Sequence, residues 1–85
     1  MTTEATKTQT DAEIIEEILT KIDKKIVLLQ TTEDLARRVG QKHRQHHARE
    51  GITCLQWAAA YIRHGRFEDA ERALEDAKAH MGALA

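Results

Sequence analysis

Apolar residues recur at helical spacing between residues 11 and 30, and polar residues fill the positions between them. The apolar residues that share an arc of about 140° on a helical wheel are Ile14, Ile15, Ile18, Leu19, Ile22, Ile26 and Leu29. Thr10 and Glu13 have the spacing of a capping box, in which each side chain accepts a hydrogen bond from a backbone amide at the helix start. This pattern predicts an amphipathic helix over residues 11–30 that buries its apolar arc, with Val27 and Leu28 outside the arc.

Residues 32–49 are far more polar. Thr31 or Thr32 can cap the start of a helix here, and Leu35 and Val39 are its only large aliphatic residues. The short connection allows this segment either to fold back on the first helix or to continue it as one bent helix. We expect it to fold back, which predicts two separate helices.

The last third of the chain predicts a helical hairpin. Gly51 is expected to end the preceding helix, and two alanine-rich helices over residues 53–64 and 67–81 follow. Between them, Gly65 can adopt the left-handed backbone conformation that ends a helix without the penalty of a β-carbon. Small alanines allow two helices to approach closely, and larger side chains then fill the space around the contact.

The order of bulky and small residues in this hairpin resembles one tetratricopeptide repeat over residues 52–82. The matching positions are Trp57, Ala58, Tyr61, Gly65, Phe67, Ala70, Leu74 and Ala77. Cys54 stands where the family usually has tryptophan, and Gly82 stands where it usually has proline. The resemblance implies two antiparallel helices with Trp57 and Phe67 packed in the core. It also implies that an isolated copy must bury the face that neighbouring repeats would cover.

Proline is absent and only four glycines occur, so little in the chain interrupts a helix. We therefore predict an all-α fold, a four-helix antiparallel bundle whose last two helices form the tetratricopeptide-like hairpin. Residues 10–85 would make this single helical domain. Residues 1–9 are polar and unpatterned, and they predict a disordered tail.

Charge and cysteine content narrow the classes of function. Thirteen basic and fourteen acidic residues give a net charge of −1, so no strong overall field draws the chain to nucleic acid or to a membrane. The single cysteine excludes an internal disulfide. No signal-peptide pattern begins the chain, and no apolar run approaches the ~20 residues of a membrane span. We therefore expect a cytoplasmic protein without membrane contact.

A basic stretch without acidic residues lies between residues 37 and 49. Its cations are Arg37, Arg38, Lys42, Arg44 and Arg49. They could hold phosphates, which makes a small nucleic-acid-binding regulator the alternative function. The cations are spread widely around the helical wheel, however, and the stretch contains no Trp, Tyr or Phe on which bases could stack.

Histidines cluster in the same stretch. His43 and His47 are four residues apart, as are His46 and Glu50, and this spacing suits two ligands of one zinc ion. A structural zinc needs four ligands, and this segment offers only a partial set. We therefore expect polar, partly exposed imidazoles, with no metal and no cofactor.

Arg38 and His43, with four residues between them, resemble the arginine–histidine element of the HEPN ribonucleases. In that family the pair would stabilise phosphate charge and move a proton. The chain is shorter than that family usually is, and we expect no enzymatic activity.

These observations favour an adaptor or regulator that binds a protein partner through a helical surface. The first helix carries more large aliphatic residues than one inward face needs, and a domain of this size gains little stability from its own core. We therefore predict a homodimer. The residues expected at the protein-binding interface are Ile22, Ile26, Val27, Leu28 and Leu29.

Overall fold

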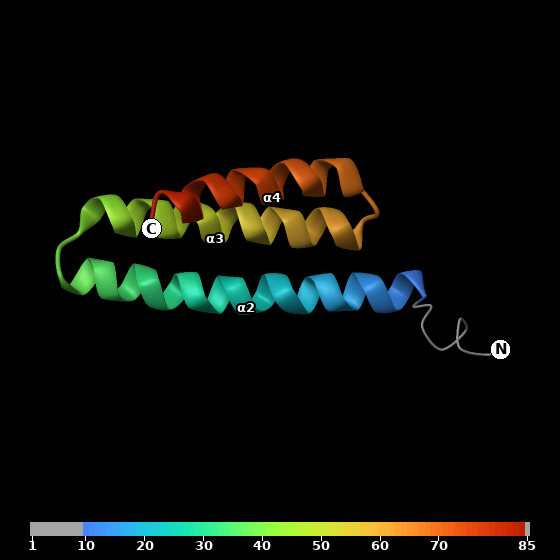
Figure 1. The fold of residues 1–85 in the computed structure, drawn as a ribbon, viewed down its shortest axis with the longest axis horizontal. Coiled ribbons are helices and arrows are strands. Elements are labelled where there is room, and N and C mark those ends of the chain that lie inside the picture. Colours follow the sequence, from blue (N-terminus) through green and yellow to red (C-terminus); the bar gives the residue numbers. More distant parts are fainter. Residues whose placement is uncertain (1–9, 85) are drawn as a thin grey trace.

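The computed structural model describes residues 10–84, which form three helices: α2 (Asp11–Arg38), α3 (Lys42–Arg63) and α4 (Phe67–Gly82). Each helix runs back along the one before it, so α2 and α4 point the same way (Figure 1). The all-α prediction is confirmed. The predicted four-helix bundle is not confirmed, because the described part of the chain contains three helices. The tail predicted for residues 1–9 lies outside the described residues.

The first two predicted helices are one continuous helix as far as Arg38. Its start matches the prediction, because Thr10 and Glu13 form both hydrogen bonds of a capping box. The break expected at Thr31 or Thr32 is wrong. Both threonine hydroxyls instead donate hydrogen bonds to carbonyl oxygens one turn earlier, a bond that threonine makes inside a continuing helix.

Two glycines end α2 and α3 in the same way. Gly40 and Gly65 have φ angles of 76° and 75°, in the left-handed region that a β-carbon disfavours. In both turns the amide after the glycine donates a 2.8 Å hydrogen bond to the carbonyl oxygen five residues before it, which is the bond of a Schellman cap. The role predicted for Gly65 is confirmed, and Gly40 makes the turn that was expected earlier in the chain, at Thr31 or Thr32.

Gly51 lies inside α3 and is buried, so the helix end predicted at this residue is wrong. A β-carbon here would come within 2.9 Å of the Cδ1 atom of Leu29 on α2. Gly51 therefore allows α2 and α3 to approach closely at this level.

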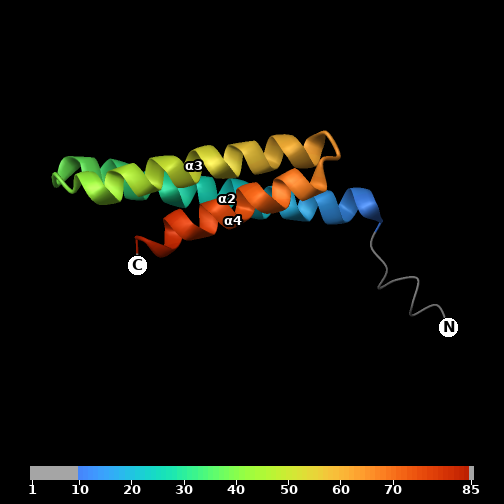
Figure 2. The ribbon, with the colours of Figure 1, turned by 90° about the horizontal axis from the view of Figure 1, so that it is seen from above.

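The central helix is α3, and α2 and α4 pack against it from two sides (Figures 1 and 2). Within residues 10–84, no Cα atom of α2 lies within 8 Å of a Cα atom of α4. The buried residues form one cluster around α3, made of Leu19, Ile22, Leu29, Ile52, Leu55, Ala58, Ala59, Ile62, Ala70, Ala73 and Ala77. Leu55 is the largest side chain that is completely buried.

Alanines form the contact between α3 and α4, as predicted, and Ala58, Ala70 and Ala77 are all buried. The core positions predicted for Trp57 and Phe67 are wrong, because these residues are 56% and 52% exposed. Helices that approach through alanines leave little depth between their axes for a large ring. Both aromatic side chains consequently lie outside the contact.

Candidate protein-binding surface

Two rows of residues run along α2, each with alternating spacings of four and three, which keep a row on one side of a helix. The inner seam consists of Ile15, Leu19, Ile22, Ile26, Leu29, Glu33 and Ala36. Every buried residue of α2 belongs to it. The outer seam begins one residue earlier and consists of Ile14, Ile18, Lys21, Lys25, Leu28, Thr32, Leu35 and Val39.

The aliphatic residues of the outer seam remain accessible. Their exposed fractions lie between 37% and 66% for Ile14, Ile18, Leu28, Leu35 and Val39. Single exposed aliphatic residues are common on protein surfaces. A row of five that follows one side of a 28-residue helix is different, because a helix of that length extends for about 42 Å. Lys21 and Lys25 divide the row into an apolar pair at the start of α2 and a second apolar group from Leu28 to Val39, which Thr32 interrupts.

Lys25 of the outer seam lines a groove between α2 and α4, and the end of the seam lines a second hollow against the start of α3. Near the middle of α2, Lys25 faces Leu74 and Met81 of α4 across a hollow of about 260 Å³, with Leu55 of α3 among its lining residues. Near the turn after α2, a second hollow of about 390 Å³ is lined by Thr32, Leu35, Ala36, Val39, Gln41 and Arg44. The groove lies where α2 and α4 share α3 as a support while their Cα atoms stay more than 8 Å apart.

Two of the five residues predicted at the interface are accessible. Ile22 and Leu29 are buried against α3, and Ile26 is half-buried beside them. Val27 and Leu28 are 60% and 65% exposed, but they point about 100° apart around the helix. Only Leu28 lies on the outer seam.

Four further residues complete the surface, and they are absent from the sequence-based interface: Ile14, Ile18, Leu35 and Val39. The sequence does indicate these four residues, because they belong to a second row with alternating spacings of four and three. This second row is difficult to see because the two seams are offset by one residue. On a helical wheel they merge into one broad arc.

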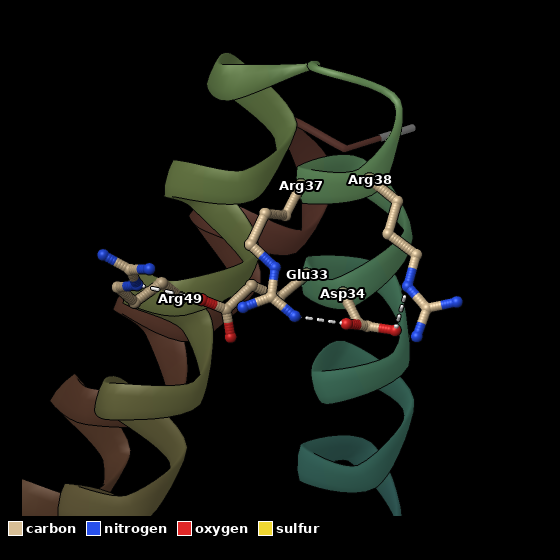
Figure 3. A network of polar contacts seen from close by, with 5 residues as sticks. All are labelled: Glu33, Asp34, Arg37, Arg38 and Arg49. Atoms are coloured by element: carbon tan, nitrogen blue, oxygen red, sulfur yellow. Dashed lines mark hydrogen bonds and ion pairs between the residues drawn. The ribbon is translucent and has the colours of Figure 1, made fainter.

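Three of the five cations predicted to bind nucleic acid are paired with acids of α2. Figure 3 shows Asp34 between Arg37 and Arg38, at 2.5 Å and 3.1 Å. In the same view Arg49 of α3 reaches Glu33 of α2 at 2.9 Å. These ion pairs lower the positive charge that the three arginines offer to a phosphate group.

The other two cations lie at the start of α3. Arg44 donates a hydrogen bond to the carbonyl oxygen of Leu84, which follows α4, and Lys42 is exposed. Of the five cations, three are therefore held in ion pairs and Arg44 in a hydrogen bond to the backbone.

The histidines form a cluster where α3 meets the end of α4. The Nδ1 atoms of His47 and His80 lie 3.0 Å apart, so one imidazole donates a hydrogen bond and the other accepts it. The rings of His43 and His46 stand edge-on to His47, at centroid distances of 4.5 and 5.3 Å. Partial burial and then the three neighbouring imidazoles lower the pKa of His47, while Glu50 opposes the shift. Within residues 10–84, no three His, Cys, Asp or Glu side chains are placed to hold one metal ion.

Among residues 10–84, no helix has the length and apolar composition needed to cross a lipid bilayer. Comparison of the chain with protein-family models, with curated proteins and with solved structures gave no significant match.

Proposed function

We propose that the chain is a small non-enzymatic interaction module that binds a protein partner through the outer seam of α2. The observation that carries this proposal is the exposed row of aliphatic residues beside an open groove. A helix placed in the groove would lie against α2 and α4 above α3 and complete a four-helix arrangement. The resemblance of residues 52–82 to a tetratricopeptide repeat supports the same class of function.

A second copy of the chain is the partner whose chemistry fits the outer seam. If the α2 helices of two copies pair antiparallel about a twofold axis, residues of one outer seam lie opposite residues of the other in four kinds of pair. These pairs are Ile14 opposite Val39, Ile18 opposite Leu35, Lys21 opposite Thr32, and Lys25 opposite Leu28. A parallel pair would instead place each lysine opposite its own copy, and like charges in apposition are unfavourable. The positions of the two lysines therefore favour the antiparallel dimer.

The mass of the protein in solution tests the dimer, and Leu28 and Val27 provide a matched pair of variants. Light scattering at tens of micromolar should give twice the 9.7 kDa monomer mass for the wild type. Leu28→Lys should give monomer, because the new lysine would face Lys25 of the other copy. Val27→Lys adds the same charge at a similarly exposed position off the seam and should remain dimeric.

A charge reversal tests the antiparallel register. Lys25→Glu added to Leu28→Lys should restore the dimer, since each new lysine would then face a glutamate. In a parallel pair the same double variant would place like charges opposite each other at both positions and would stay monomeric. A wild-type mass near 9.7 kDa, or equal disruption by Val27→Lys, would refute self-association through the outer seam.

A salt titration separates this function from the alternative of nucleic-acid binding. Binding to phosphates weakens steeply as salt increases, because it depends on the release of counterions. Pairing through an apolar seam should change little. Salt-sensitive binding of DNA or RNA that is lost in Arg44→Gln but kept in Leu28→Lys would favour the nucleic-acid function instead.

A further inference from the structure

The exposed tryptophan marks a second surface, on the side of α3 that faces away from the groove. Trp57 lies two residues after Leu55, which lines the groove, and this places them about 160° apart around the helix. The indole stacks on Tyr61, with ring centroids 5.7 Å apart and an angle of 29° between the ring planes. Tryptophan is enriched at the centres of protein interfaces, where the binding partner covers its ring.

A hollow of about 310 Å³ between α3 and α4 lies beside this stack. Its lining residues are Cys54, Trp57, Tyr61, Asp69, Arg72, Ala73 and Asp76. We call it the Trp57 hollow. Its aromatic wall is Trp57 and Tyr61, and α4 supplies a wall with two carboxylates, Asp69 and Asp76, and one cation, Arg72. The hollow therefore combines an accessible π surface with carboxylates.

The charges around the Trp57 hollow are incompletely paired. Asp69 forms ion pairs with Arg66 at 2.6 Å and with Arg72 at 3.8 Å. Asp76 and Glu50 form no ion pair within the described part of the chain.

The thiol of Cys54 lies between α3 and α4, and its pKa depends on its burial and on these carboxylates. Burial, and then the negative charges of Asp76 and Glu50, raises the pKa of Cys54. Cys54 is consequently a neutral, half-buried part of the lining. The ionisable residues of α4 in the lining are Asp69, Arg72 and Asp76, and Asp76 is the carboxylate among them without an ion pair in residues 10–84.

The molecule itself shows that this aromatic stack accommodates a cation. The guanidinium carbon of Arg66 lies 5.4 Å from the centroid of the Tyr61 ring, within the distance of a cation–π interaction. The other ring of the stack, Trp57, is the stronger cation–π acceptor of the two residue types. It is accessible and lies in the same hollow as Asp76.

We propose that the Trp57 hollow binds a basic segment of a protein partner, with an arginine or lysine side chain held against Trp57 and paired with Asp76. This site is separate from the outer seam of α2, and it does not depend on the dimer. One surface would pair two copies, and the other would recruit a cationic partner.

The chain provides its own reporter for a test, because Trp57 is its only tryptophan. The full chain should be titrated with an acetylated peptide of alternating arginine and glycine, and separately with the same peptide carrying glutamate in place of arginine. The arginine peptide should produce a saturable change in Trp57 fluorescence, and the glutamate peptide should produce none. Saturable binding of the glutamate peptide would overturn the proposal.

Matched variants locate the binding. Asp76→Asn should weaken binding of the arginine peptide about fivefold, the equivalent of one surface ion pair. Glu71→Gln removes the same charge from the groove side of α4 and should leave binding unchanged. Equal weakening by both variants would show an unspecific charge effect and would overturn the proposal.

The nature of the aromatic contact is tested by calorimetry, which does not need the tryptophan signal. Affinity for the arginine peptide should fall in the order Trp57, Trp57→Phe, Trp57→Leu, because leucine retains apolar bulk but has no π face. Circular dichroism should show an unchanged helical fold in each variant. Equal affinity of the phenylalanine and leucine variants would exclude the cation–π contact. The Leu28→Lys variant should also be diluted without any peptide. A change in its Trp57 fluorescence on dilution would show that a second copy occupies the hollow, and would overturn the proposal.

Discussion

Replacing Gly65 with alanine should destabilise the fold, although alanine is the better helix former. Gly65 has a φ angle of 75°, and the left-handed conformation costs an L-residue about 1–2 kcal/mol. No heavy atom lies within 4 Å of the β-carbon that would be added, so steric overlap contributes nothing. Alanine also restricts the unfolded chain, which offsets about 0.4–1 kcal/mol of the cost. The net loss in the free energy of unfolding should be about 1 kcal/mol.

Gly82 provides the matched control. It is the last residue of α4, is not among the glycines with positive φ, and also has no heavy atom within 4 Å of an added β-carbon. The same glycine-to-alanine change should therefore be neutral or stabilise the protein by up to about 1 kcal/mol. Only the backbone conformation distinguishes the two sites.

Urea denaturation followed by circular dichroism measures both variants. With a denaturant dependence of about 1 kcal/mol per molar for a domain this small, Gly65→Ala should lower the midpoint by about 1 M. Protein concentration must be equal in all samples, because self-association shifts apparent stability. A Gly65→Ala midpoint at or above that of Gly82→Ala would refute the backbone argument.

Four further outcomes are expected. Ala70→Leu or Ala77→Leu should destabilise the fold by about 1–3 kcal/mol through overpacking at the α3–α4 contact, measured as a lower denaturation midpoint. Added zinc should not raise the melting temperature, and a rise that is lost in His43→Ala would contradict this expectation. Because the pKa of His47 is lowered on folding, the unfolded chain binds more protons, so stability should fall as pH decreases below about 6.5, and less so in His47→Asn. Cys54 should react with iodoacetamide more slowly in the folded protein than in urea, because its thiol pKa is raised.

The glycines show how far sequence reasoning reaches. Gly65 was predictable as a helix end because a polar turn and a new amphipathic pattern follow it. Gly40 makes an equivalent turn, but Thr31 and Thr32, followed by two acidic residues, have the usual pattern of a helix start. The turn was therefore predicted at the threonines. Gly51 is the opposite case, because its role depends on the close approach of Leu29 from another helix. Local sequence does not distinguish a glycine that ends a helix from one that makes room for a neighbour.

An exposed aliphatic surface on the first helix was predictable in kind but not in position. An excess of aliphatic residues on the first helix indicated a surface beyond the core. Which of them face outward depends on where α3 lies against α2, and that placement also depends on Gly40 as the true turn. Trp57 was placed in the core because large aromatic residues usually pack there. The alanine contact between α3 and α4 moves it to the surface, and this is a property of helix spacing that no single residue encodes.

The separation of the α2 and α4 backbones also has a kinetic consequence. In residues 10–84, every close approach of Cα atoms between helices joins two helices that are neighbours in sequence, across turns of three residues. Such a topology has low contact order, and helical proteins of this kind fold in microseconds to milliseconds. Folding can begin at either turn and spread along α3, since neither hairpin needs the other to close its own contacts. The chain would reach its folded form, with the outer seam still open, well before it met a second copy.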